Sequence, residues 1–297
     1  MKLGSIGTAM VTPFTKEGEI DFEVTTLLIQ HLIDNGTDSL IVNGTTGEAP
    51  TLSEEEKEQL LSHVIAVVGN RISVIAGTGS NDTRGSIRAT KRAEELGADG
   101  VMLVVPYYNK PDQNGLYKHF KTIAESTTLP VLLYNIPGRT GINLTTETVV
   151  RLSKVDNIRA VKEASGDLTQ MAEIIDRTKD NFNVYSGDDA LTLPLLAVGG
   201  SGIISVSSHI VGLEMQRMIR DFQDGNTIDA AVRHRTLLPL FEALFSKPNP
   251  VPIKYLLRKI GLSVGDVRLP LVGITESDAY LDGALKTFQQ QTSGENE

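Results

Sequence analysis

Short apolar segments rich in Val, Ile and Leu recur along the chain, and longer segments with a helical period separate them. Most of these short segments do not alternate between apolar and polar residues, which is typical of parallel strands covered by helices. We therefore predict eight strands, at residues 6–11, 39–42, 73–76, 100–105, 131–134, 158–162, 183–186 and 202–206.

The segments between these strands have the pattern of amphipathic helices. Apolar residues that include Leu28 and Leu32 follow a 3.6-residue period. Ser53 and Glu56 have the spacing of a capping box, and Gly69 follows the last apolar residue of that helix. One strand and its helix together span roughly 20–35 residues, the size of a βα unit.

Eight strands that alternate with helices predict an α/β fold, a (β/α)8 TIM barrel. The alternative is a doubly wound sheet, which usually has a Gly-rich fingerprint after its first strand. This chain has Thr12-Pro-Phe there, Gly77-Thr-Gly-Ser-Asn81 lacks the third glycine of the dinucleotide pattern, and no P-loop occurs.

Beyond about residue 225 the pattern is helical only, so we expect two parts of the chain. Residues 1–224 would form the catalytic barrel, and residues 225–297 would form a C-terminal helical extension. Three helices are predicted in this extension, at residues 230–245, 252–260 and 276–289.

Composition excludes several classes of protein. The 297 residues carry a net charge of −9, which disfavours binding to nucleic acid. Without cysteine there are no disulfides, thiolate nucleophiles or Cys-ligated metals, which fits a cytoplasmic protein. No apolar segment has the length of a membrane span or a signal peptide.

Metal and serine-hydrolase chemistry also find little support. The five histidines are far apart and form no His-Glu-x-x-His pair, and Gly-x-Ser-x-Gly is absent. We expect His31, His63 and His119 to be surface residues of helices. Asp188 and Asp189 could bind a metal, but acidic residues that open a helix are more often caps.

The candidate chemistry gathers where the predicted strands end. Lys162 lies near the end of an apolar strand and before a polar Gly loop. A lysine among apolar neighbours loses hydration, and its neutral amine becomes available to form a Schiff base with a carbonyl substrate. The alternative is a lysine that extends to water, as most lysines at strand ends do.

Other polar residues follow neighbouring strands, and barrel enzymes place their active sites at these ends. The segment Gly44-Thr-Thr-Gly could bind a carboxylate or simply form a turn before the next helix. Tyr134 could be a core aromatic residue, or it could carry protons. Arg139 lies in a Pro-Gly loop, where arginines are usually solvated, although it could bind an anion.

With these motifs assembled, the chain resembles the dihydrodipicolinate synthases, within the N-acetylneuraminate lyase family of class I aldolase barrels. The resemblance covers essentially the whole chain, and the paired residues Thr45 and Thr46 favour the synthases over the sialic-acid lyases. Five segments carry it: Gly44-Thr-Thr-Gly-Glu48, Pro106-Tyr-Tyr-Asn-Lys-Pro111, Tyr134-Asn-Ile-Pro-Gly-Arg139, Lys162-Glu-Ala-Ser-Gly-Asp167 and Val267-Arg-Leu-Pro-Leu271.

The resemblance implies a set of catalytic roles. Lys162 would condense with pyruvate to an imine and then an enamine. Tyr134 and Thr46 would form a proton relay, completed by Tyr108 from a neighbouring subunit. The enamine would attack L-aspartate 4-semialdehyde, and cyclisation would release 4-hydroxy-tetrahydrodipicolinate, which enters diaminopimelate and lysine biosynthesis.

The resemblance also implies how the substrates are held. Thr45 and Thr46 would contact pyruvate, Arg139 would bind the carboxylate of the semialdehyde, and backbone groups at Gly187 and Ile204 would frame the pyruvate site. No metal or organic cofactor is implied, because the imine nitrogen is itself the electron sink. The expected assembly is a homotetramer built from two tight dimers.

Two questions stay open at the level of sequence. A pyruvate-dependent aldolase for a sugar acid and a silent barrel that only binds a carboxylate are the competing hypotheses, and Arg139 argues against the first. Lysine-inhibited relatives carry Ser, His and Glu residues where this chain has Ala49, Glu54, Lys57 and Gly85. We therefore expect weak or absent inhibition by lysine.

Overall fold

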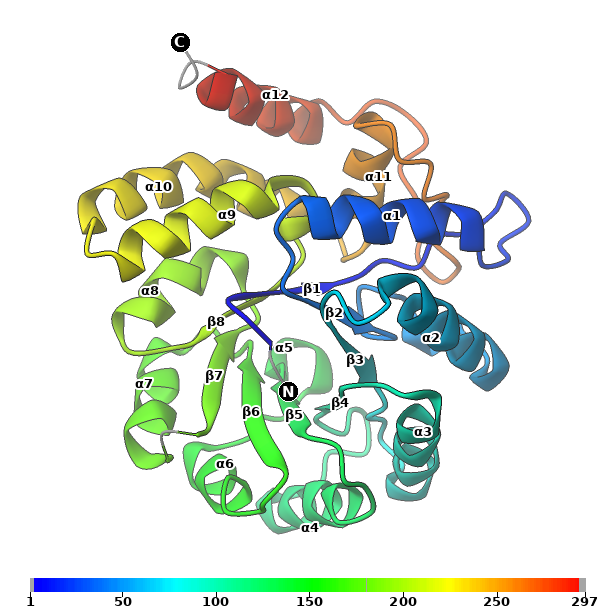
Figure 1. The fold of residues 1–297 in the computed structure, drawn as a ribbon, viewed down its shortest axis with the longest axis vertical. Coiled ribbons are helices and arrows are strands. Elements are labelled where there is room, and N and C mark those ends of the chain that lie inside the picture. The colour runs from blue at the N-terminus through cyan, green and yellow to red at the C-terminus, as the bar shows by residue number, and fades with distance from the viewer. Residues whose placement is uncertain (1–2, 180, 294–297) are drawn as a thin grey trace.

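The computed structural model describes residues 3–179 and 181–293, and within them eight parallel strands form one closed barrel in chain order (Figure 1). The predicted barrel is thus confirmed, and the observed strands begin at the predicted residues and end within two residues of the predicted ends. They are β1 (Ile6–Ala9), β2 (Ser39–Val42), β3 (Ser73–Gly77), β4 (Gly100–Val104), β5 (Val131–Asn135), β6 (Ile158–Glu163), β7 (Asn183–Ser186) and β8 (Gly202–Ser205).

Alternation along the strands divides the apolar side chains between two cores. Side chains such as Ile41, Met102 and Leu132 fill the barrel interior, while their chain neighbours Leu40 and Leu103 pack against the surrounding helices. Both faces of every strand are therefore covered, which explains why the strands read as continuous apolar segments in the sequence.

Helices pack around the barrel in the order of the chain (Figure 1). Capping side chains begin several of them, and the predicted box of Ser53 and Glu56 is present, with Gly69 in a left-handed C-cap. The helices around the barrel are α1 (Phe22–Asp34), α2 (Glu54–Val68), α3 (Thr83–Leu96), α4 (Gln113–Ala124), α6 (Thr146–Leu152), α7 (Leu168–Arg177), α8 (Thr192–Ala197) and α9 (Ser208–Gln223). Shorter turns follow three strands: η1 (Ala49–Thr51), α5 (Pro137–Thr140) and η2 (Asp189–Leu191).

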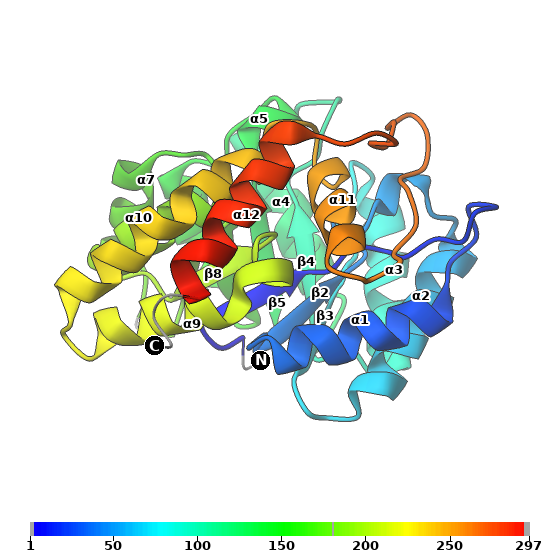
Figure 2. The same ribbon diagram turned by 90° about the horizontal axis from the view of Figure 1, so that it is seen from above.

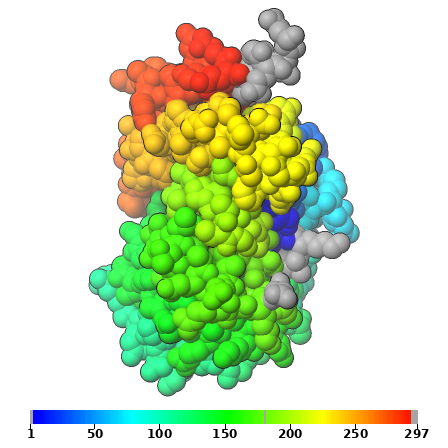
Figure 3. All heavy atoms as spheres, turned by 90° about the vertical axis from the view of Figure 1, so that its left-hand side faces the viewer, coloured from blue at the N-terminus to red at the C-terminus, as the bar shows by residue number. Residues whose placement is uncertain are grey.

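Three helices follow the barrel: α10 (Thr227–Leu244), α11 (Val251–Lys259) and α12 (Ala279–Ser293). Helix α10 packs against α9, and α12 packs against α10, so this segment covers one side of the barrel (Figures 2 and 3). The helices lie near their predicted positions, whereas the division into a barrel and an extension stays a prediction. Residues 294–297, the end of the predicted extension, lie outside the described part of the chain.

The expectation of surface histidines was wrong for His119. Its side chain is buried, and its Nδ1 is 2.9 Å from the Thr83 hydroxyl. Burial lowers the pKa of His119 to about 4, so the ring is neutral at neutral pH. His31 and His63 are half-buried, and each has a hydrogen-bond partner on another element. The position of a histidine on a predicted helix does not show which residues of other elements cover its ring.

Candidate active site

Lys162 and Tyr134 meet in the barrel interior, at the carboxyl ends of neighbouring strands. They are register partners on β6 and β5, and only 5% of Lys162 and 4% of Tyr134 are exposed. The Lys162 Nζ lies 4.3 Å from the centre of the Tyr134 ring. The structure therefore buries the amine and brings it into contact with the phenol, as the imine hypothesis requires.

Gly187, directly after β7, leaves room for the stem of Lys162. A Cβ atom at this position would lie 3.0 Å from Cε of Lys162 and 2.7 Å from Cβ of Ala164. The Gly187 amide donates to the Glu163 carbonyl at 2.8 Å, which fixes the loop beside β6. A larger residue at 187 would displace the side chain of Lys162, so the sequence-predicted Gly187 does lie beside Lys162.

A cavity of about 500 Å³ opens at the same end of the barrel, within the range of small-molecule sites. Thr45, Tyr134 and Arg139 line it, so residues from the loops after β2 and β5 share one space. Arg139 is exposed on α5 and supplies positive charge in a chain whose net charge is −9. A guanidinium in this position suits a carboxylate ligand.

Thr46 occupies a deeper position than its neighbour Thr45. Its side chain is buried, and its Oγ1 accepts a hydrogen bond of 2.9 Å from Nδ2 of Asn249. Ile204 is likewise buried in the barrel interior, on β8. Asn249 was missed by sequence reasoning, because it lies between α10 and α11 in a segment predicted only as a helical extension.

Tyr108 lies apart from the buried site residues. It is 90% exposed and has a φ of 72°, a left-handed backbone that is uncommon for a tyrosine. The cavity lining, within the described residues, includes its neighbour Tyr107 but not Tyr108. The structure of one chain therefore does not bring Tyr108 to Lys162, and its predicted role in a neighbouring subunit stays a prediction.

Glu163 follows Lys162 in the chain, but its side chain points to the other side of β6. Its carboxylate accepts hydrogen bonds from the amides of Asn135 and Gln170 and from the Ser165 backbone N–H. Burial raises the pKa of Glu163, while these hydrogen bonds oppose the shift. The arrangement ties the ends of β5 and β6 together and so supports the position of Lys162.

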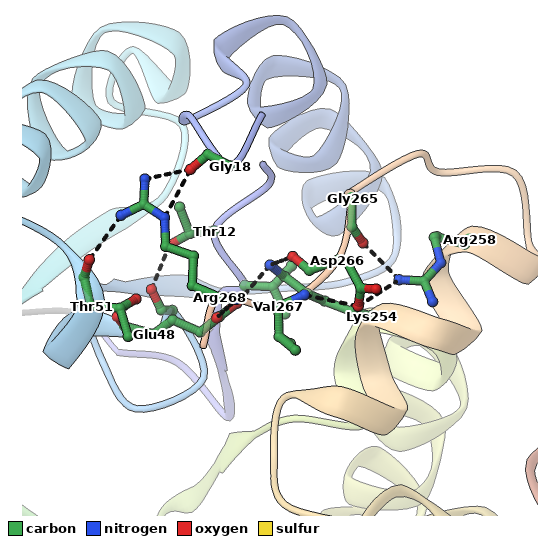
Figure 4. A network of polar contacts seen from close by, with 12 residues as sticks. Thr12, Gly18, Glu48, Thr51, Lys254, Arg258, Gly265, Asp266, Val267 and Arg268 are labelled. Carbon is green, nitrogen blue, oxygen red and sulfur yellow. Dashed lines mark hydrogen bonds and ion pairs between the residues drawn. The ribbon is translucent and has the colours of Figure 1, made fainter. Parts of the chain in front are cut away.

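A second buried network escaped the sequence analysis (Figure 4). Lys254 of α11 is fully buried, and its Nζ lies 2.6 Å from the carboxylate of Glu48, which directly follows the Thr45-Thr46-Gly47 loop. Glu48 also accepts from the backbone N–H of Arg268. The sequence did contain one signal for this network, because Lys254 is a cation within the apolar segment 251–257.

The two acidic residues after β7, Asp188 and Asp189, accept hydrogen bonds that hold the local backbone. Asp188 accepts from the Ala190 N–H, which confirms a cap at η2, and Asp189 is buried and accepts from the backbone and hydroxyl of Ser207. Within residues 3–179 and 181–293, no group of three or more His, Asp or Glu side chains is placed to hold a metal ion. In the same part of the chain, no helix is long and apolar enough to cross a membrane.

A closed parallel barrel with a cavity at the carboxyl ends of its strands is an enzyme architecture, and a buried lysine at that end is a residue type that can form an imine. The dihydrodipicolinate synthetase family matches residues 2–286, and the chain belongs to this family.

Individual relatives agree with this assignment. The 4-hydroxy-tetrahydrodipicolinate synthase of Bacillus subtilis strain 168 is 56% identical over 279 residues, which cover 94% of this chain and 96% of that protein. A dihydrodipicolinate synthase structure from Bacillus anthracis is 55% identical, with a TM-score of 0.93 and coverage of 97% and 98%. A lysine-bound DHDPS structure from Cyanidioschyzon merolae is 49% identical, with a TM-score of 0.92 and coverage of 98% and 97%.

Proposed function

We propose that this chain condenses pyruvate with L-aspartate 4-semialdehyde and forms 4-hydroxy-tetrahydrodipicolinate, a step of diaminopimelate and lysine biosynthesis. The observation that carries the proposal is the contact between Lys162 and Tyr134, both buried at the end of the barrel where the cavity opens. The names of the relatives supply the identity of the product, and the family resemblance of the motifs supplies the two substrates.

The reaction begins at the amine of Lys162. Its nitrogen attacks the carbonyl carbon of pyruvate, and loss of water gives an imine. Removal of a methyl proton then gives an enamine, whose carbon attacks the aldehyde. The amino group of the second substrate displaces Lys162 from the imine carbon, which closes the ring and returns the free enzyme. The imine nitrogen accepts the electrons, so the proposal includes no metal or organic cofactor.

Side chains around Lys162 take the supporting roles. Tyr134 transfers protons, with Thr46 as its relay partner, and Thr45 contacts pyruvate. Arg139 shares the cavity with Tyr134, which supports its binding of the semialdehyde carboxylate. The group of residues that frame pyruvate also includes Gly187, beside the Lys162 stem, and Ile204.

Assembly into a cytoplasmic homotetramer of two dimers completes the proposal. Tyr108 is 90% exposed and has a left-handed backbone conformation, so its side chain is available to a neighbouring subunit. Strain of this kind is costly and is often found at functional sites. If Tyr108 acts in a partner, Tyr108→Phe should lower turnover without changing the unfolding free energy of the chain.

Regulation by lysine should be weak in this enzyme. Ala49, Lys57 and Gly85 line the cavity where lysine-inhibited relatives are expected to carry other side chains. The ammonium of Lys57, although paired with Glu54 at 2.8 Å, faces a cationic ligand unfavourably, and Gly85 supplies no carboxylate. The lysine-bound relative shows that lysine occupies a family member, so a titration is informative. Strong inhibition below millimolar lysine would contradict this expectation.

Borohydride reduction in the presence of pyruvate tests the mechanism. Peptide mass mapping should find one adduct, on Lys162, and none in Lys162→Ala. Product analysis with pyruvate plus the semialdehyde, against pyruvate plus N-acetylmannosamine, tests the choice of substrate. Tyr134→Phe should lower turnover by roughly 10²–10⁴-fold if the phenol transfers protons. An adduct elsewhere would reject the mechanism, and a loss of less than about threefold would make Tyr134 a packing residue.

A further inference from the structure

Two parallel links join the threonine loop after β2 to the beginning of α11. Asn249 donates through Nδ2 to Oγ1 of Thr46 at 2.9 Å. Five residues further along, Lys254 binds Glu48 at 2.6 Å, two residues beyond Thr46. The C-terminal segment thus holds the loop at two points, one of which is a residue of the proposed active site.

The second link is built rigidly. Lys254 and Glu48 are buried, and the Lys254 Nζ also donates to the Asp266 carbonyl and lies 4.1 Å from the centre of the Phe14 ring. Arg268 donates its backbone N–H to Glu48, and its guanidinium binds the Gly18 and Thr51 carbonyls (Figure 4). Because these contacts fix both segments, Asn249 meets Thr46 in a set geometry.

The direction of the first link determines what Thr46 can do. A threonine hydroxyl has one O–H to donate and two lone pairs that accept. When Asn249 supplies the donor, the hydrogen of Thr46 is directed away from Asn249 and is available to another acceptor. The Oδ1 of Asn249 accepts from no group in the described chain, so the contact with Thr46 is what orients this amide.

We propose that Asn249 is a positioning residue, which holds the hydroxyl of Thr46 as a hydrogen-bond donor toward the 2-oxo acid bound at Lys162. The inference rests on the proposed function for the identity of that acid, pyruvate, and for the place of Thr46 in its site. It places part of the active site's geometry in the C-terminal segment that follows the barrel.

A double-mutant cycle on imine formation tests the proposal. The rate of trapping by cyanoborohydride at limiting pyruvate is measured for the wild type, Asn249→Ala, Thr46→Val and the double variant. We expect Asn249→Ala to lower this rate about tenfold in the wild type, as loss of a buried hydrogen bond does. In the Thr46→Val background the same change should have less than about a twofold effect, because its target is already absent.

Two further variants separate positioning from folding. Asn249→Asp keeps the shape but has no N–H to donate when ionised, so it should lower the rate as Asn249→Ala does. Asn157→Ala is the matched control, since the amide of Asn157 bonds three backbone carbonyls at the other end of the barrel wall. It should lower the thermal midpoint and leave the trapping rate within about twofold of the wild type.

The outcomes distinguish this inference from the proposed function. Trapping needs only pyruvate and Lys162, so it reports even if turnover with the semialdehyde fails. Additive effects of Asn249→Ala and Thr46→Val, or equal rate losses in Asn249→Ala and Asn157→Ala, would overturn the positioning role. Absence of any imine in the wild type would overturn the proposed function and this inference together.

Discussion

Two buried lysines, Lys162 on β6 and Lys254 on α11, differ in their partners. Lys254 has no exposed surface and lies 2.6 Å from the carboxylate of Glu48. Lys162 is 5% exposed, and among the described residues no carboxylate forms an ion pair with it; its contact is the ring of Tyr134. Both amines lie over an aromatic ring, at 4.3 Å for Lys162 and 4.1 Å for Lys254.

The difference determines what each of the two lysines is able to do. The ammonium of Lys254 donates to a carboxylate and a carbonyl. An ammonium has no lone pair, so in this state the nitrogen cannot attack a carbonyl carbon. An amine that faces a phenol ring and has no ionic partner keeps its lone pair accessible once it is deprotonated. Burial alone therefore does not identify a candidate nucleophile, and the absence of an ionic partner is what favours Lys162 over Lys254.

The largest expected effect is on turnover. Lys162→Met should lower kcat by more than about 10³-fold, because no other amine replaces the nucleophile. The unfolding free energy from urea denaturation should stay the same or rise, since an apolar side chain replaces a buried polar group without an ionic partner. A variant that kept its activity, or lost stability, would remove the contrast between the two lysines.

The same substitution at the other lysine should have the opposite result. Lys254→Met leaves Glu48 buried and unpaired, so the unfolding free energy should fall by about 3–5 kcal/mol. Urea denaturation measures the loss, and the double variant with Glu48→Gln should recover part of it. A single variant as stable as the wild type would show that the pair contributes nothing to the fold.

A smaller effect is expected at the aromatic residue beneath Lys254. The guanidinium of Arg268 also lies over Phe14, at 4.3 Å from its ring centre. Phe14→Leu removes both cation–π contacts and some packing, which should lower the unfolding free energy by about 2 kcal/mol. Tyr134→Phe is the matched control, because it keeps a ring beside Lys162 and should leave stability almost unchanged.

The effect that is smallest per step of the measurement, one pH unit, concerns the titration of Lys254. Burial lowers the pKa of Lys254 to about 8, while the charge of Glu48 opposes the shift. Between about pH 8 and pH 10.5 the unfolded chain binds the proton that the folded chain has lost, so the unfolding free energy of the wild type rises with pH there. Relative to Lys254→Met, the slope should be at most about 1.4 kcal/mol per pH unit. A negative slope would show that Glu48 keeps Lys254 charged.

Much of the fold was predictable because strands and helices have different apolar periods. Strands covered on both faces read as continuous apolar segments, and the capping box at Ser53 marked the beginning of α2. Lys162 and Tyr134 could be placed in one site because the ends of consecutive parallel strands lie at the same edge of the barrel.

The burial of single side chains was less predictable. His119 was expected at the surface, yet it is buried and hydrogen-bonded to Thr83 of α3. Asn249 had no motif to mark it, because its partner Thr46 lies on a loop near the other end of the chain. Such contacts depend on how elements pack, and local periodicity carries no information about them.

The sequence alone predicted the barrel, the order of its strands and the candidate nucleophile. These features depend on apolar periodicity and on neighbours along the chain. Only the tertiary structure decided which buried cation has an ionic partner. Lys162 and Lys254 both interrupt apolar segments and look alike in the sequence. Their environments differ because Glu48, distant along the chain, pairs with Lys254, whereas Lys162 lies beside Tyr134, a residue that lines the cavity.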